Sequence, residues 1–295
     1  MRGKKPTLGI IGAGRVGTGL AMNFARSGRS VVALASRRAT SARALARRVP
    51  GARAFPSSQE VADRADLVFL TVPDDAIESV ASGIRWRAGA ACVHCSGAGD
   101  LDLLRKASRD GARVGGFHPL RMFGEPGKSL DMRGCAIAIA GPEGLAKELE
   151  QLARAIRARP LRLPEGGRAL YHAAANFSGA FVVALIEETV ALWKMLGIAE
   201  KDALRALLPL LRGSVDNVEK LGPAGALGSV VARGDVGTIR RHLAALAKTA
   251  PESLELYRLL SQRTIPVALA KGTLSPEGAK EIGALLGGFR GSGGA

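Results

Sequence analysis

Short apolar runs alternate with helical segments along the first half of the chain. The runs that we expect to form strands are residues 7–11, 31–35, 67–72, 91–94, 113–116 and 135–140. Between them, the spacing of alanine and leucine predicts helices at residues 16–27, 40–48, 75–82, 101–108 and 143–157. Strands that alternate with helices are typical of β-α-β units. The first half therefore predicts an α/β fold with a doubly wound, mostly parallel sheet.

The pattern changes after residue 163. Strand-like runs end there, and long helical stretches follow at residues 169–196, 200–219, 236–248, 251–271 and 276–286. Asp235 and Ser275 stand where the start signals of two of these helices are expected. We therefore predict an α/β domain over residues 1–163, an all-helical domain over residues 164–288 and a flexible, glycine-rich tail over residues 289–295.

A glycine pattern joins the first predicted strand to the first predicted helix. Its residues are Gly12, Ala13, Gly14, Arg15, Val16 and Gly17. In a Gly-x-Gly-x-x-Gly turn of this kind the first glycine permits a tight turn, the second lets a pyrophosphate approach the backbone, and the third lets helix and strand pack closely. The phosphates then lie on free N–H groups of the helix N-terminus. The sequence therefore predicts a Rossmann sheet that binds a dinucleotide.

The end of the second predicted strand favours NADP over NAD. An NAD site usually has a carboxylate here that accepts a hydrogen bond from the ribose 2′-hydroxyl. This chain has Ser36, Arg37 and Arg38 instead. A guanidinium group can bind a 2′-phosphate with two parallel hydrogen bonds. The alternative is that Arg37 and Arg38 simply begin the next helix.

Loops that follow later strands are candidates for contacts with the cofactor and the substrate, because ligands of such sheets bind outside the carboxyl ends of the strands. We expect Thr71, Val72 and Pro73 to cover the adenine or ribose. Ser96 can contact the cofactor and hydrogen-bond a substrate carbonyl or carboxylate, and His118 can donate the proton that hydride transfer to a carbonyl or imine requires. The alternative for each is a local turn or cap hydrogen bond.

The first helix of the second predicted domain carries two more polar candidates. His172 and Asn176 are four residues apart and therefore project from one helix face. Polar groups on a helix otherwise rich in alanine and phenylalanine need partners, and a cleft between domains can provide them. The alternative is a hydrogen-bonded core histidine beside an exposed asparagine.

The formal net charge of +16 at pH 7 has two interpretations. A basic chain suits an anionic partner such as nucleic acid, a membrane surface or a phosphorylated ligand. Alternatively, its arginines are simply spread over solvated faces. The basic residues form no long run and are hardly interleaved with aromatic residues, which favours the second interpretation and predicts no nucleic-acid partner.

The three cysteines, Cys92, Cys95 and Cys135, are too few and uneven for a disulfide scaffold. Cys92 and Cys95 match Cys-x-x-Cys, but no second ligand pair follows, so buried thiols are favoured over a zinc or redox site and we predict no metal. The N-terminus lacks the apolar stretch of a signal peptide, and polar residues interrupt residues 169–196. We therefore predict a cytoplasmic protein with no membrane span.

Six motifs follow one another along the chain, at residues 10–17, 69–74, 94–98, 117–120, 171–175 and 232–235. In this order they resemble a group of bacterial oxidoreductases that have a Rossmann-like domain followed by a helical domain of unknown function. The wider clan includes pyrroline-5-carboxylate reductase, ketopantoate reductase and the β-hydroxyacid dehydrogenases. The resemblance implies a nicotinamide cofactor, a small-molecule substrate between the domains, a helical domain like the C-terminal domain of 6-phosphogluconate dehydrogenase, and a homodimer formed through that domain.

This chain differs from the clan at one catalytic position. Dehydrogenases of the clan place a catalytic lysine on the helix between the domains, one turn before an asparagine. In this chain no lysine is available, and His172 with Asn176 occupies roughly that place.

These features predict an NADP-dependent oxidoreductase that reduces a small oxo or imino acid, with a ketopantoate-like substrate within that class. His118 or His172 would supply the proton, while Ser96 and Asn176 would orient the substrate. The missing lysine supports an alternative, a non-catalytic NADP(H)-binding sensor or scaffold.

Overall fold

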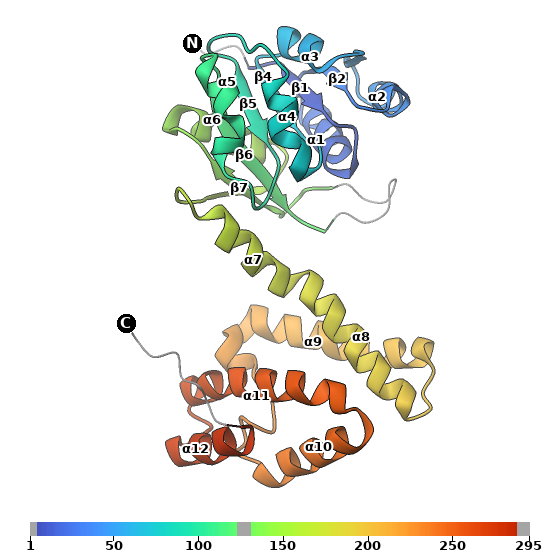
Figure 1. Cartoon of the computed structure of the whole chain (residues 1–295), viewed down its shortest axis with the longest axis vertical. Coiled ribbons are helices and arrows are strands. Elements are labelled where there is room, and N and C mark those ends of the chain that lie inside the picture. Colours follow the sequence, from blue (N-terminus) through green and yellow to red (C-terminus); the bar gives the residue numbers. More distant parts are fainter. Residues whose placement is uncertain (1–4, 123–130, 288–295) are drawn as a thin grey trace. The chain divides into compact units, whose positions relative to one another are not determined.

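The computed structural model describes residues 5–122 and 131–287, so the predicted tail at residues 289–295 lies outside the described residues. Contacts divide the chain into two compact units, Met1–Ala180 and Phe181–Ala295 (Figure 1). Helix α7 (Arg168–Ser178), the first after the sheet, is grouped with the first unit although it falls within the predicted helical domain. Its contacts with the sheet, described below, account for this grouping.

The first unit is built on one eight-stranded sheet with the order β3-β2-β1-β4-β5-β6-β7-β8. Neighbouring strands pair in parallel except β6 and β7, which are antiparallel. The predicted doubly wound, mostly parallel sheet is therefore confirmed. The strands are β1 (Leu8–Ile11), β2 (Val31–Ala35), β3 (Arg53–Ala54), β4 (Leu67–Leu70), β5 (Ala91–His94), β6 (Arg113–Leu120), β7 (Ala136–Ala140) and β8 (Arg159–Arg162).

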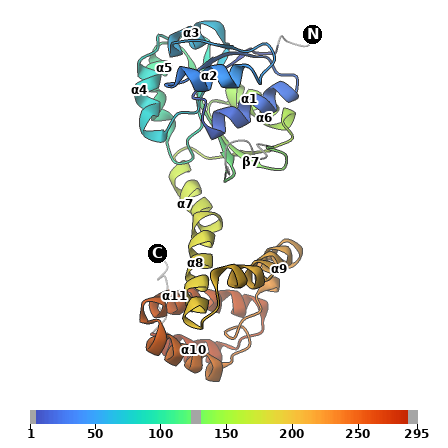
Figure 2. The ribbon, with the colours of Figure 1, turned by 90° about the vertical axis from the view of Figure 1, so that its right-hand side faces the viewer.

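Helices cover both faces of this sheet, and each face has its own apolar core. Figure 2 shows α1 and α6 on one side and α4 and α5 on the other. Phe24, Phe69 and Phe117 pack together on the α1 side, with ring centroids 5.2 Å apart for two of the pairs. The helices before α7 are α1 (Arg15–Arg26), α2 (Ala39–Ala46), α3 (Ser58–Arg64), α4 (Ile77–Ser82), α5 (Arg105–Arg109) and α6 (Glu143–Ala155), with short 3-10 turns η1 (Asp74–Ala76) and η2 (Leu101–Leu104).

The second unit is built from helices in its described residues. Its core is apolar and includes Ile239, Ile265 and Ile282. The predicted start signals are confirmed: Asp235 accepts a hydrogen bond from Thr238 N–H at 2.9 Å, and Ser275 accepts one from Gly278 N–H at 3.1 Å. The helices are α8 (Ala180–Met195), α9 (Glu200–Ala226), α10 (Val236–Thr249), α11 (Pro251–Lys271) and α12 (Pro276–Leu285).

One described helical stretch, Arg168–Met195, is long and apolar enough to cross a membrane by length and composition alone. A single such stretch is weak evidence, because helices of proteins outside membranes also pass this test. The chain bends within it, since Gly179 has non-helical backbone angles between α7 and α8.

Candidate functional site

The glycine turn after β1 is locked against the end of β4. Gly12 has a φ of +110°, and a Cβ there would lie 2.6 Å from the Thr71 carbonyl oxygen. A Cβ on Gly17 would overlap the Gly12 carbonyl oxygen and lie 2.5 Å from Thr71 Oγ1. That hydroxyl donates to the Gly12 carbonyl at 2.7 Å. Gly12 and Gly17 are therefore required by the packing of the protein itself, and Thr71 holds the turn in place.

Gly14 differs from its two neighbours in the motif. It is the N-cap of α1, it is exposed, and a Cβ built on it would meet no atom of residues 5–122 and 131–287 within 4 Å. No side chain caps this helix end. The structure itself gives no reason for a glycine here, whereas a dinucleotide pyrophosphate lying on the N–H groups of the first turn would need the space. The turn therefore fits the predicted cofactor.

The end of β2 also fits NADP. Arg37 and Arg38 are exposed, and within the described part of the chain neither forms a hydrogen bond or an ion pair through its side chain. Arg38 is at the same time the N-cap of α2, so it does begin the next helix. Its guanidinium group and that of Arg37 remain available to an anion, and Ser36 beside them is partly buried.

The hydroxyl of Ser96 is already occupied within the chain. Ser96 is 3% exposed, its Oγ donates to Asp74 Oδ2 at 2.6 Å, and the same Oγ accepts from Gly99 N–H at 2.9 Å. The local turn bond that was the alternative for this residue is therefore present. Asp74, which follows Thr71, Val72 and Pro73, is exposed and is tied to the turn after β5 by this bond.

His118 is brought together with two residues of α7. Its Nδ1 lies 3.0 Å from the hydroxyl of Tyr171, at hydrogen-bond distance. The His118 and His172 rings lie edge to face with centroids 5.8 Å apart. Gly97 makes this possible, because a Cβ there would overlap the His172 ring and lie 3.0 Å from His118 Nε2. Tyr171 was not among the predicted site residues, although it stands next to His172 in the sequence.

The electrostatic surroundings keep His118 neutral. The pKa of His118 is lowered to about 4, mainly by burial and then by the positive charges of Arg168 and His172, while the carboxylate of Asp74 raises it by less. Burial also raises the pKa of Tyr171. Near neutral pH the pair is therefore an uncharged imidazole and an uncharged phenol that share a hydrogen bond.

A cavity of about 710 Å³ lies beside this pair, within the first unit. His118, Tyr171, His172 and Asn176 line it together with apolar side chains such as Met122. The amide of Asn176 donates to the His172 carbonyl oxygen at 3.3 Å. The volume is in the range of small-molecule sites. The structure thus brings three of the four predicted catalytic residues to one cavity, while Ser96 lies on the neighbouring turn.

Two buried basic side chains near this cavity were not predicted as site residues. Arg168, at the first position of α7, is 1% exposed, and its guanidinium donates to the Ser96 carbonyl oxygen. His94 is fully buried, and burial with the Arg168 charge lowers its pKa to about 3. The sequence could have marked Arg168 as a candidate site residue. A cation in the first turn of a helix is disfavoured by the helix dipole, so an arginine there needs a reason.

The cysteines are buried free thiols, as predicted. Burial raises the pKa of Cys92 and Cys95, so neither is a reactive thiolate. Among residues 5–122 and 131–287 no group of three or more His, Cys, Asp or Glu side chains has an arrangement suited to a metal ion.

Comparison with known protein families finds two successive domains, and the second begins within the sheet, before β7, α6 and β8. Residues 1–119 match the Rossmann-like domain, and residues 135–264 match a domain of unknown function, DUF2520. The predicted combination of a Rossmann-like domain with a C-terminal helical domain of unknown function is therefore confirmed. The curated proteins contain no match to this chain.

Several solved structures are similar over most of the chain. A candidate NADP oxidoreductase from Bacteroides fragilis is 26% identical, with a TM-score of 0.68 over 88% of this chain and 97% of that one. Protein TM1727 from Thermotoga maritima is 24% identical, with a TM-score of 0.74 over 90% and 99%. A reductive aminase from Aspergillus terreus, solved with NADPH and ethyl levulinate, is 21% identical, with a TM-score of 0.59 over 96% and 93%. The fold is thus shared with a candidate NADP oxidoreductase and with reductive aminases and imine reductases.

Proposed function

We propose that this chain, which joins a Rossmann-like domain to a DUF2520 domain, is an NADP-dependent oxidoreductase that reduces a small oxo or imino acid. The His118–Tyr171 pair carries the proposal, because it places an uncharged proton donor on a substrate-sized cavity lined by β6 and α7. The open Gly14 turn and the exposed Arg37 and Arg38 support NADP as the cofactor.

The similar structures support the same class of reaction. The Bacteroides fragilis protein is a candidate NADP oxidoreductase, and the Aspergillus terreus enzyme was solved with NADPH and a keto ester. We extend carbonyl or imine reduction to this chain on that basis. A ketopantoate-like acid is one member of the proposed substrate class.

The bound nicotinamide would supply the hydride, and the residues of this chain would supply the proton and the orientation. His118 is the proposed proton donor: Nε2–H gives its proton to the substrate while Nδ1 takes the proton of the Tyr171 hydroxyl, so the imidazole stays uncharged. The phenolate that remains on Tyr171 is stabilised by the positive charge of Arg168. His172 and Asn176, which line the same cavity, are assigned to orienting the substrate. Ser96 would act through its hydrogen bond to Asp74, by fixing the turn that borders the site.

The second unit offers a matched control for the site. His242 Nδ1 lies 2.9 Å from the hydroxyl of Tyr257, and the rings lie edge to face with centroids 5.8 Å apart. This pair reproduces the geometry of His118 and Tyr171, but His242 is exposed. The same substitution can therefore be made in both pairs.

The test is NADPH oxidation with a panel of 2-oxo acids, aldehydes and cyclic imines. His118→Gln should lower kcat by about 100-fold or more, the usual contribution of a general acid, whereas His242→Gln should leave it unchanged. Tight NADPH binding without NADPH oxidation in the presence of any member of the panel would contradict the enzyme proposal and favour the sensor or scaffold alternative. Failure to bind NADPH would remove the whole proposal.

We also propose that the protein is a cytoplasmic homodimer formed through its helical unit, without a nucleic-acid or membrane partner. Large apolar side chains are exposed on α8 and α9, among them Val183 at 56%, Leu210 at 69% and Leu221 at 62%. Exposed apolar surface of this kind needs a cover, and a second copy of the chain supplies one by symmetry.

A further inference from the structure

Arg168 is a buried cation without a matching anion. Its side chain is 1% exposed, and within residues 5–122 and 131–287 it forms no salt bridge. One nitrogen donates to the Ser96 carbonyl oxygen, while Nε and the other terminal nitrogen have no hydrogen-bond partner in the described part of the chain. Burial lowers the pKa of Arg168, and the opposing effects of Cys95, Tyr171, Asp100 and Asp74 are each smaller.

Such a placement is unfavourable for stability in two ways. A buried charge loses its hydration, and a neutral carbonyl oxygen returns only part of that loss. A cation at the first position of a helix also opposes the helix dipole. An apolar side chain of similar length would fill the same space without either cost, so packing alone does not explain an arginine at position 168.

Arg168 contacts the segments that hold His118 and Tyr171 in place. Tyr171 and His172 are three and four residues further along α7, and therefore lie on the same face of the helix as Arg168. The Ser96 carbonyl that it holds precedes Gly97, against which both histidine rings pack.

The sheet also approaches Arg168 directly. A Cβ on Gly116 would lie 2.6 Å from a guanidinium nitrogen, so β6 reaches the arginine only because this residue is a glycine. His118 is two residues further along the same strand and points the same way from the sheet. The guanidinium of Arg168, carried by α7, thus contacts the turn after β5 and approaches strand β6.

We propose that Arg168 is a positioning residue for the His118–Tyr171 pair, which fixes the turn after β5 and strand β6 against α7 and places a positive charge behind the pair. The inference rests on the proposed function for its catalytic meaning. Its structural part concerns only the protein and can be measured without a substrate.

The charge of Arg168 has a defined effect on its neighbours. The titratable groups that act on His118 or share its hydrogen bond are Arg168, His172, Asp74, Tyr171 and the nearby His94. Only Asp74 favours protonation of His118, and Asp74 is exposed and already accepts a hydrogen bond from Ser96. Removing the Arg168 charge should therefore make His118 easier to protonate, although the effect of burial remains.

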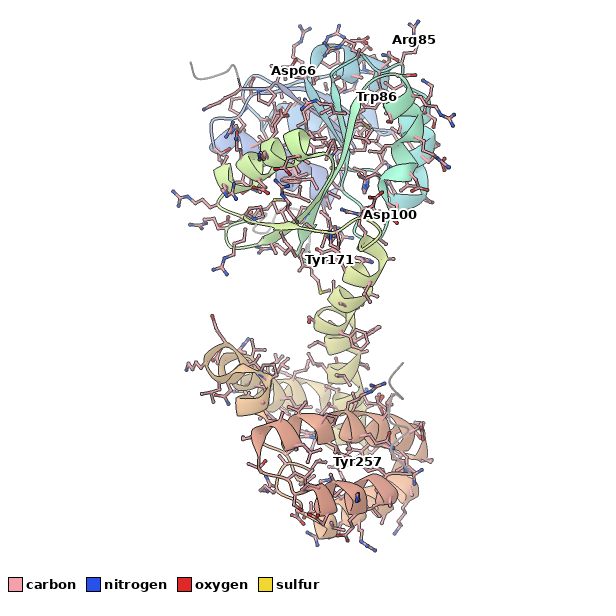
Figure 3. The ribbon with its side chains drawn as sticks, turned by 90° about the vertical axis from the view of Figure 1, so that its left-hand side faces the viewer. Asp66, Arg85, Trp86, Asp100, Tyr171 and Tyr257 are labelled. Carbon is pink, nitrogen blue, oxygen red and sulfur yellow. The ribbon has the colours of Figure 1, made fainter. Side chains whose placement is uncertain are left out.

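The test is a histidine NMR titration of the full-length protein, with the His118 signal assigned by its loss in His118→Gln. In Arg168→Met the His118 midpoint should rise by about one pH unit or more, the lower end of the effect of a nearby charge. In Arg168→Lys, which keeps the charge, it should stay close to that of the wild type. Arg85→Met is the control, because Arg85 is exposed and lies at the far end of the first unit from Tyr171 (Figure 3).

An unchanged His118 midpoint in a folded Arg168→Met protein overturns the inference. A lower melting temperature would not rescue it, because loss of a purely structural residue also lowers the melting temperature. If Arg168→Met does not fold, a raised midpoint in Arg168→Lys overturns it instead. Where the panel identifies a substrate, kcat should fall about tenfold in Arg168→Met with a smaller change in KM. Loss of the positive charge raises the pKa of Tyr171 and makes its hydroxyl a weaker acid, and one pKa unit corresponds to a factor of ten. Absence of turnover would count against the proposed function and leave the NMR result standing.

Discussion

Replacement of single glycines in the turn after β1 separates what the fold needs from what the cofactor needs. Gly14→Ala adds a methyl group that meets no atom of the described residues within 4 Å, whereas Gly17→Ala adds one that overlaps the Gly12 carbonyl oxygen. The two substitutions are chemically identical and lie three residues apart. We expect the first to impair NADPH binding alone and the second to impair the fold.

The magnitudes follow from these surroundings. Gly14 has ordinary extended backbone angles, so alanine should change the free energy of unfolding by no more than about 0.5 kcal/mol. A methyl group that keeps a phosphate away from one backbone N–H removes a charge-assisted hydrogen bond worth about 1.5–3 kcal/mol, or about 10- to 100-fold in affinity. At Gly17 the overlapping atom belongs to the backbone, and forcing it aside should cost about 1–3 kcal/mol or more.

Urea unfolding and NADPH titration by fluorescence measure both quantities on the same samples. Gly144→Ala is the control, because Gly144 is also exposed, lies near the start of α6 and has no atom within 4 Å of a built Cβ, but is outside the motif. It should leave NADPH affinity unchanged. A Gly14→Ala protein that binds NADPH as tightly as the wild type would refute the assignment of the pyrophosphate to this turn. A Gly17→Ala protein of wild-type stability would refute the packing argument.

Three further predictions concern charge, pH and assembly. Joint replacement of Arg37 and Arg38 by alanine should weaken NADPH binding by about 10- to 100-fold and leave NADH binding unchanged. Arg43→Ala is the control, because Arg43 is an exposed arginine on α2, and it should alter neither affinity. Equal losses for both nucleotides would contradict the 2′-phosphate assignment. The pKa of His118 is lowered from 6.5 to about 4 by folding, so the folded state binds fewer protons in that window and should lose about 3 kcal/mol of stability as the pH falls through it. Urea titrations should show a loss about 3 kcal/mol smaller in His118→Gln than in the wild type, with the remaining loss due to His94, whose pKa is also lowered by folding. Equal pH profiles would exclude His118 as a source. Leu210→Asp should convert a dimer into a monomer in light scattering, and a wild type that is already monomeric would contradict the proposed homodimer.

Much of the fold follows from short stretches of sequence. The strands 31–35 and 91–94 and the helix 251–271 have the predicted bounds, because period-two and helical patterns report which local face is buried. Three elements of the first unit were not predicted: β3, α3 and β8. β3 has only two residues, and β8 is a largely exposed edge strand of sequence Arg-Pro-Leu-Arg, so neither carries the apolar run of a central strand. The predicted helix 169–196 is divided at Gly179, although alanine and leucine continue on both sides.

The dinucleotide turn could be determined from sequence alone, since its glycines act through the backbone within six consecutive residues. The catalytic end depended on the tertiary structure. Only folding brings Tyr171 to within hydrogen-bond distance of His118, 53 residues earlier, and turns the Ser96 hydroxyl toward Asp74. Composition alone does not distinguish Arg168 from the many other arginines of this basic chain. Its burial follows only from the packing of α7 against β6 and the turn after β5. A side chain's burial and partners depend on segments that are distant along the chain, and these set the charge state of a histidine and therefore the chemistry that it can perform.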